Sequence, residues 1–368
     1  MTNTVAFPGL GLEFTINRVA FTLGNMPIYW YGILIGGGFV LAMLYALQRS
    51  KEFGVDSDRL IDVIFGGAVL GIIGARLYYV AFRWEYYSQD LTQIFNTRSG
   101  GMAIYGGIVA GFLGGWFMCR LRKVKILPAA DLAATGFLLG QGIGRWGNFV
   151  NVEAFGGNTS LPWGMTSPVI TEYLTEHEAE LEALGMNIDP HMPVHPTFLY
   201  ESVWCLLGFA LLIWYTKRRK FDGELLLLYG VWYGAERMVV EGLRTDSLII
   251  PGTSLRASQV LAAVLVVACA IALVVLRKKT QEKLRLDPSA PVLYRDTEEG
   301  QRVISGTFYP KKGKAKSEPA PEAEAPAAPE EAAPEAQEPE TAPETPAQEP
   351  SAEELTEKTE EEAAHKEQ

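Results

Sequence analysis

The chain has 368 residues, a mean hydropathy of +0.08 and a formal net charge of −11. These averages hide two unlike parts, because residues 27 to 276 hold repeated apolar stretches while residues 318 to 368 are nearly all Glu, Pro, Ala, Thr and Gln. The second part carries 17 Glu and two Lys, so the rest of the chain has a charge of about +4. The apolar stretches exclude a soluble globular protein, and the three cysteines, which lie within them, exclude a disulfide framework and a zinc site.

Seven stretches are long and apolar enough to cross a hydrocarbon core roughly 30 Å thick as helices. In chain order they cover residues 27–48, 60–82, 101–119, 128–143, 198–215, 224–240 and 257–276. The predicted fold class is therefore an all-α polytopic membrane protein with about seven transmembrane helices.

Basic residues gather in alternate loops. The third loop contains Arg120, Arg122, Lys123 and Lys125, residues 217 to 220 are all Lys or Arg, and further basic residues follow position 276. The positive-inside rule places these loops in the cytoplasm. Residues 1–26 then form an external segment, residues 27–285 the membrane domain, and residues 286–368 a cytoplasmic tail. The tail has too few apolar residues to offset chain entropy, so we expect it to be disordered and dispensable.

The external loop between the fourth and fifth spans is too long to be a passive connector. Residues 171–184 predict a surface helix, because Leu174, His177, Leu181 and Leu184 fall on one stripe and Gly185 provides a stop. We expect residues 154 to 194 or so to form a small cap on the outer membrane surface.

Ionisable residues inside the spans are costly to place in a bilayer and are therefore candidate functional groups. In this orientation most of them lie near the outer face: Arg76, Arg145, Glu201, Arg237, Glu241 and Arg244. One ion pair at a helix end would be explained by structure alone. Several arginines around one apolar-walled region instead predict an anion site, because guanidinium matches phosphate oxygens bidentately. At the outer leaflet, the anion is a phospholipid head group.

The segment from Gly144 to Gly156, GRWGNFVNVEAFG, resembles the signature of the prolipoprotein diacylglyceryl transferases. Further matches are Tyr31-Gly32, GARL at 74–77, GMAIYGG at 101–107, HPTFLYE at 195–201 and the segment from 237 to 247. The resemblance covers roughly residues 20 to 280. It implies that phosphatidylglycerol donates its diacylglyceryl group to the lipobox cysteine of a preprolipoprotein signal peptide, with release of glycerol-1-phosphate, in a bacterial inner membrane.

The resemblance also implies roles for individual residues. Phosphatidylglycerol would be bound by Arg145, Asn148, Asn151, Glu153, Gly156, Tyr31, Arg76 and Arg244. The catalytic group would comprise Arg145, Arg237, Tyr105, Glu201 and Glu241, with the acidic residues orienting arginines or accepting the thiol proton. Tyr105 stands where many members have histidine, which puts an obligatory imidazole base in doubt. We expect no cofactor, no metal ion and no nucleic-acid partner, and we expect a monomer.

Two other classes fit part of the pattern. A secondary transporter for an anionic solute would suit glycine-rich spans with buried arginines, but its charges would lie at the midplane between inverted repeats. A scaffolding membrane protein would not need four arginines at one depth.

Overall fold

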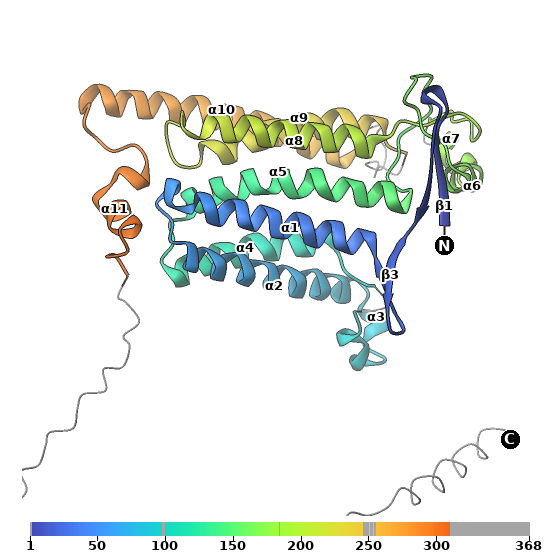
Figure 1. The fold of residues 1–368 in the computed structure, drawn as a ribbon, viewed down its shortest axis with the longest axis horizontal. Helices are drawn as coiled ribbons and strands as arrows, with labels where there is room; N and C mark the ends of the chain where they lie inside the picture. The colour runs from blue at the N-terminus through green and yellow to red at the C-terminus, as the bar shows by residue number, and fades with distance from the viewer. Residues whose placement is uncertain are drawn as a thin grey trace, which may run out of the picture. The chain divides into compact units, whose positions relative to one another are not determined.

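The computed structural model describes residues 2–97, 100–183, 185–245, 250, 253 and 255–309. Its long helices run side by side as a bundle (Figure 1). They are α1 (Trp30–Arg49), α2 (Ser57–Phe82), α4 (Ile104–Arg122), α5 (Ile126–Asn151), α8 (Thr197–Thr216), α9 (Glu224–Leu243) and α10 (Ala257–Leu286). Helix α5 packs on α1 at one side and on α8 and α9 at the other, while α2 packs on α4 and α9 on α10. The three helices α5, α8 and α9 therefore share one interior.

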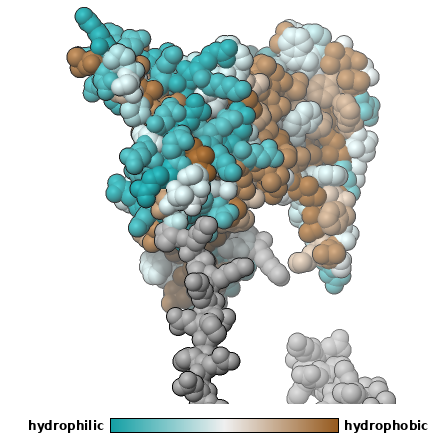
Figure 2. Space-filling view, turned by 60° about the vertical axis from the view of Figure 1, so that its left-hand side comes forward, coloured by the Kyte–Doolittle hydropathy of each residue, from teal (hydrophilic) through white to brown (hydrophobic). Residues whose placement is uncertain are grey.

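Six of these helices, all except α9, are long and apolar enough to cross a membrane. Hydrophobic side chains cover a broad area of the bundle in Figure 2, and hydrophilic ones gather toward one end. The predicted class of polytopic helical membrane protein is confirmed. Helix α9 lies where the sixth span was predicted, but it carries Glu224, Glu236, Arg237 and Glu241 and is not among the six.

Helix α5 is longer than predicted and continues to Asn151. The predicted span ended at residue 143. Gly147 is helical nonetheless, and its lack of a side chain makes room for α1, since a Cβ there would lie 2.5 Å from the ring of Tyr31. The first part of the Gly144–Gly156 motif is consequently helix, and the external loop starts later than predicted.

The segment before α1 forms two antiparallel hairpins. The first pairs β1 (Thr2–Phe7) with β2 (Leu12–Asn17), and the second pairs β3 (Val19–Leu23) with β4 (Met26–Tyr29). Residues 27 to 29, which were predicted to open the first span, are therefore strand. Strand β1 also joins the cap through reciprocal backbone hydrogen bonds of 2.9 and 2.8 Å between Ala6 and Thr166.

The cap contains two short helices where one was predicted. Helix α6 (Pro168–Glu176) ends at His177, whose ring stacks on Tyr173, and α7 (Glu178–Ala183) follows. Leu174 and Leu181 of the predicted stripe are both buried, and Gly185 adopts a left-handed φ of 79° after α7. Leu184 lies outside the described residues.

The chain after α10 folds back on the bundle at the end opposite the hairpins (Figure 1). It forms the 3-10 turn η4 (Tyr294–Asp296) and helix α11 (Glu298–Ile304). The Tyr294 amide donates to Asp222 Oδ2 at 2.6 Å, and Lys125 pairs with Glu299 at 3.1 Å. The prediction of a disordered tail from residue 286 is wrong for residues 287–309, which contain apolar side chains for anchoring, such as the buried Val303. Residues 310–368 lie outside the described residues.

We expect truncation after Arg285 to destabilise the protein and truncation after Lys311 to leave its stability unchanged, because only the first removes the segment bound to Asp222 and Lys125. Each kcal/mol lost from the free energy of unfolding lowers the melting temperature of a large domain by about 2–4 °C. Thermal unfolding of both variants in detergent measures the difference. Equal melting temperatures would show that residues 287–309 contribute nothing to stability.

Candidate active site

Three arginines surround one buried carboxylate where α5, α8 and α9 meet. Glu201 lies one turn into α8 and is 2% exposed. Its carboxylate pairs with Nε of Arg145 from α5, with Nη1 of Arg237 from α9 at 3.1 Å, and with Nη1 of Arg244 at 3.9 Å. The structure therefore brings together four of the predicted residues, which lie on three separate segments of the sequence.

Two further carboxyl groups belong to this cluster. Glu241 pairs with Arg237 one helical turn away, as the spacing predicted. Glu236, which was not among the predicted site residues, is 4% exposed and neither carboxyl oxygen has a hydrogen-bond partner among the described residues. An ionised carboxyl without a donor is costly in a dry interior. The described part of the cluster contains three guanidinium groups around Glu201, and their planar donors match the oxygens of a phosphodiester.

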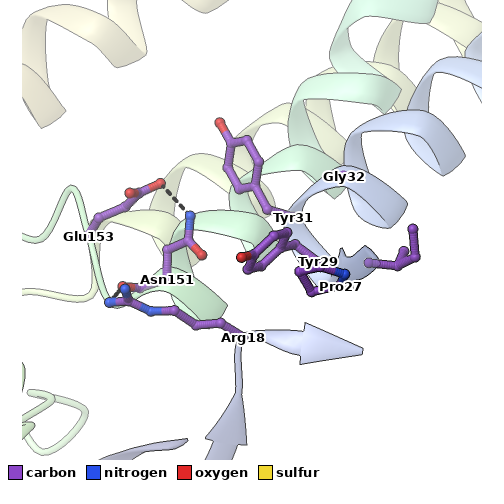
Figure 3. Close-up of a pocket in the computed structure, with 8 residues that line it drawn as sticks. Arg18, Pro27, Tyr29, Tyr31, Gly32, Asn151 and Glu153 are labelled. Carbon is purple, nitrogen blue, oxygen red and sulfur yellow. Dashed lines mark hydrogen bonds between the residues drawn. The ribbon is translucent and has the colours of Figure 1, made fainter. Parts of the chain in front are cut away.

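A second polar group continues from the first along α5. Asn148 lies one turn beyond Arg145, and its amide donates to Glu153 Oε1 at 3.0 Å, as does the amide of Asn151 at 3.3 Å. Figure 3 shows Asn151 and Glu153 on one side of a cleft that Tyr31 also lines. The structure thus places the predicted residues Asn148, Asn151, Glu153 and Tyr31 together.

The turn that carries Glu153 has an unusual backbone. Val152 and Ala154, on either side of Glu153, adopt left-handed φ angles of 55° and 56°. This region is unfavourable for residues other than glycine, especially for a β-branched residue, and such strain concentrates at functional sites. The turn is held in place because Thr197 Oγ1 donates to the carbonyl oxygen of Ala154.

Gly156 connects the turn to the segment that carries Arg244. Its amide donates to the His195 carbonyl at 2.9 Å, and the next amide donates to the Leu243 carbonyl at 2.7 Å. A Cβ at Gly156 would lie 2.8 Å from the Cβ of His195, so only glycine allows this approach. The geometry therefore gives Gly156 a part in positioning Arg244.

Arg76 does not join the cluster, and its geometry contradicts the predicted contact with lipid. Its side chain is 7% exposed. Its guanidinium makes five hydrogen bonds of 2.6 to 3.0 Å to backbone carbonyls of Gln93, Ile94, Asn96, Gly100 and Gly101. All five donors are used to hold this loop against α2.

Tyr105 also lies apart. It is in the first turn of α4, is 60% exposed, and makes no hydrogen bond or ring contact with the cluster among the described residues. Helix α4 packs mainly on α2. The structure therefore gives no support to a direct catalytic role for Tyr105.

The sequence marked His195 only weakly, as a member of the HPTFLYE motif. Its Nδ1 lies 3.1 Å from the Tyr200 hydroxyl, which accepts from Trp163 Nε1 at 2.8 Å. Burial lowers the pKa of His195 below its usual value, so the ring is neutral near pH 7. Arg18 is a further residue of the cleft that no motif indicated, since its contact is with Asn151, far along the chain.

Residues 18–275 match the prolipoprotein diacylglyceryl transferase family. The phosphatidylglycerol–prolipoprotein diacylglyceryl transferase of Clostridioides difficile is 39% identical over 269 residues, which cover 73% of this chain and 99% of that protein. The enzyme of the same name from Bacillus cytotoxicus is 41% identical over 278 residues, 75% of this chain and 98% of its own. The enzyme of the same name from Staphylococcus haemolyticus is 40% identical over 270 residues, which cover 73% of this chain and 91% of that protein.

We expect Glu201→Gln to destabilise the protein strongly, because three arginines lose their shared counter-charge. Breaking a buried ion pair from one side costs about 3–5 kcal/mol, which corresponds to a fall in melting temperature of about 6 °C or more. The exposed Glu85→Gln is the matched control. An unchanged melting temperature in Glu201→Gln would show that the stability of the protein does not depend on this carboxylate.

Proposed function

The chain belongs to the prolipoprotein diacylglyceryl transferase family, and we propose that it transfers the diacylglyceryl group of phosphatidylglycerol to the lipobox cysteine of prolipoproteins. The observation that carries this proposal is the grouping of Arg145, Arg237 and Arg244 around Glu201. A phosphodiester is the ligand that such a group of guanidinium donors prefers. The bundle that holds it has the apolar exterior that membrane-bound substrates require.

The reaction exchanges one bond for another. The lipobox sulfur attacks the glycerol carbon of the diacylglyceryl group, a carbon–sulfur bond forms, and the carbon–oxygen bond to phosphate breaks with its electron pair on the phosphate oxygen. The thiol proton passes to water, and glycerol-1-phosphate leaves. The thiolate is the reactive form of cysteine, and a positive field favours it.

The arginines act on the leaving group. Charge grows on the phosphate oxygens as the carbon–oxygen bond breaks, so donors fixed beforehand stabilise the transition state more than the ground state. In this proposal Arg145 and Arg237 bind these oxygens and Arg244 assists. Glu201 and Glu241 are paired with arginines and therefore orient them. Asn148, Asn151, Glu153 and Tyr31 contact the head group beyond the phosphate.

We also propose a location and an assembly. The protein lies in the bacterial inner membrane with residues 1–26 and the cap outside and residues 287–309 in the cytoplasm, because the loops rich in Lys and Arg lie at the end that carries α11. It works as a monomer, since helices of one chain complete the arginine cluster.

Purified protein is expected to convert phosphatidylglycerol and a lipobox peptide into a thioether-linked diacylglyceryl peptide, detected by mass spectrometry. Arg145→Lys keeps the charge but loses the planar fork, so we expect it to bind lipid and to lose about 10²–10³ in turnover. Arg145→Gln loses the charge as well and is expected to be slower still. The exposed Arg83→Gln serves as control. Full turnover per folded molecule in Arg145→Gln would remove this arginine from the mechanism.

Orientation is tested with single cysteines and an impermeant thiol reagent in intact cells. The native Cys119, Cys205 and Cys269 are buried and give little background. We expect labelling at Ser160→Cys in the cap, and labelling at Ser305→Cys after α11 only once the cells are permeabilised. The opposite pattern would reverse the proposed topology.

A further inference from the structure

A cleft of about 590 Å³ opens between the second hairpin, the start of α1 and the end of α5. It is lined by Arg18, Pro27, Ile28, Tyr29, Tyr31, Gly32, Asn151 and Glu153. In Figure 3, Arg18, Asn151 and Glu153 converge on one side and the two tyrosines face them. Its volume lies in the range of small-molecule sites, and both a cation and an anion line it.

Arg18 has hydrogen-bonding capacity that the protein does not use. Its Nη2 donates to the carbonyl oxygen of Asn151 at 2.7 Å. Its Nε is buried and has no hydrogen-bond partner among the described residues. A guanidinium has five donors in a fixed fork, and the described residues bind only one of its Nη donors, so this arginine can hold the end of α5 and still donate to a ligand through another Nη group.

Glu153 offers the complementary acceptor. The amides of Asn148 and Asn151 both donate to Oε1, and no bond to Oε2 is made by the described residues. The left-handed residues on either side hold the carboxylate in one place, so little order would be lost when a ligand binds. The cleft therefore presents a fixed acceptor opposite a fixed donor.

The cleft continues the path of the head group away from the arginine cluster. Asn148 lies one turn beyond Arg145, and the rise of an α-helix puts Asn151 about 9 Å beyond Arg145 along the axis. Side chains of both asparagines reach Glu153. A phosphate held at Arg145 would thus project its alcohol substituent toward Arg18.

We propose that Arg18 binds the hydroxyl groups of the terminal glycerol of the lipid donor, with Glu153, and thereby selects a head group that carries a diol. A hydroxyl both donates and accepts hydrogen bonds, so it pairs with the carboxylate and the guanidinium together. This inference rests on the proposed function and adds a residue that determines donor specificity.

The test compares two donors, phosphatidylglycerol and phosphatidylpropanol, which has the same length without hydroxyl groups. With wild-type protein, kcat/KM should be about tenfold or more higher for phosphatidylglycerol than for phosphatidylpropanol. Hydrogen bonds to charged groups are stronger than those between neutral groups, and about 1.4 kcal/mol of lost stabilisation lowers a rate tenfold. In Arg18→Gln this preference should fall toward one, chiefly through slower reaction with phosphatidylglycerol. The exposed Arg83→Gln should keep the wild-type preference.

Arg18→Lys keeps a positive charge near the C-terminus of α5, which preserves folding if Arg18→Gln does not, but it loses the fork and should lose most of the preference. A folded Arg18 variant with the wild-type preference overturns the proposal, even if its melting temperature falls. Absence of product from both donors with wild-type protein would instead overturn the proposed function itself.

Discussion

Glu201 lies where water is scarce, and its charge is tolerable there only because guanidinium groups surround it. Arg145 and Arg237 are equally dependent on it, since each would otherwise be a partly buried cation within an apolar bundle. The carboxylate therefore fixes the positions of α5, α8 and α9 relative to one another. The same cluster presents guanidinium donors whose geometry suits the oxygens of a bound phosphate.

The opposite end of the bundle uses buried charge only for structure. Asp131 is fully buried in α5 and accepts hydrogen bonds from the amides of Gly223 and Leu226 at 2.8 and 2.9 Å. These amides belong to the first turn of α9 and have no partner inside the helix. Asp131 therefore caps α9, and both of its carboxylate oxygens accept hydrogen bonds from the chain. Glu236 differs from Asp131, because neither of its carboxyl oxygens has a hydrogen-bond partner among the described residues.

The sequence predicted those features that depend on residue type and spacing. Ionisable residues inside apolar stretches indicated the cluster of Arg145, Glu201, Arg237, Glu241 and Arg244, because the cost of burial applies whatever the fold. Arg76 met the same criterion and yet binds backbone carbonyls, which carry no signal in sequence. The end of α5 was missed as well, and there Gly147 fits against the ring of Tyr31 on α1, a contact that carries no signal in sequence.

Arg18 illustrates the remaining limit. It precedes the first span outside every recognised motif, and only the folded chain brings it to Asn151, 133 positions later. This contact depends on how the second hairpin packs against the end of α5. Local patterns of hydrophobicity do not predict such packing.

The strained turn around Glu153 limits which substitutions its neighbouring residues can accept during evolution. A left-handed conformation costs a non-glycine residue about 1–2 kcal/mol, so glycine at position 154, where the side chain is only half-buried, would relieve the folded state. It would also loosen the carboxylate that the turn holds, because glycine admits many more backbone conformations. Thermal stability and order of the carboxylate thus favour opposite residues at position 154. Variants selected only for heat tolerance should accumulate glycine here, and variants selected for turnover should discard it.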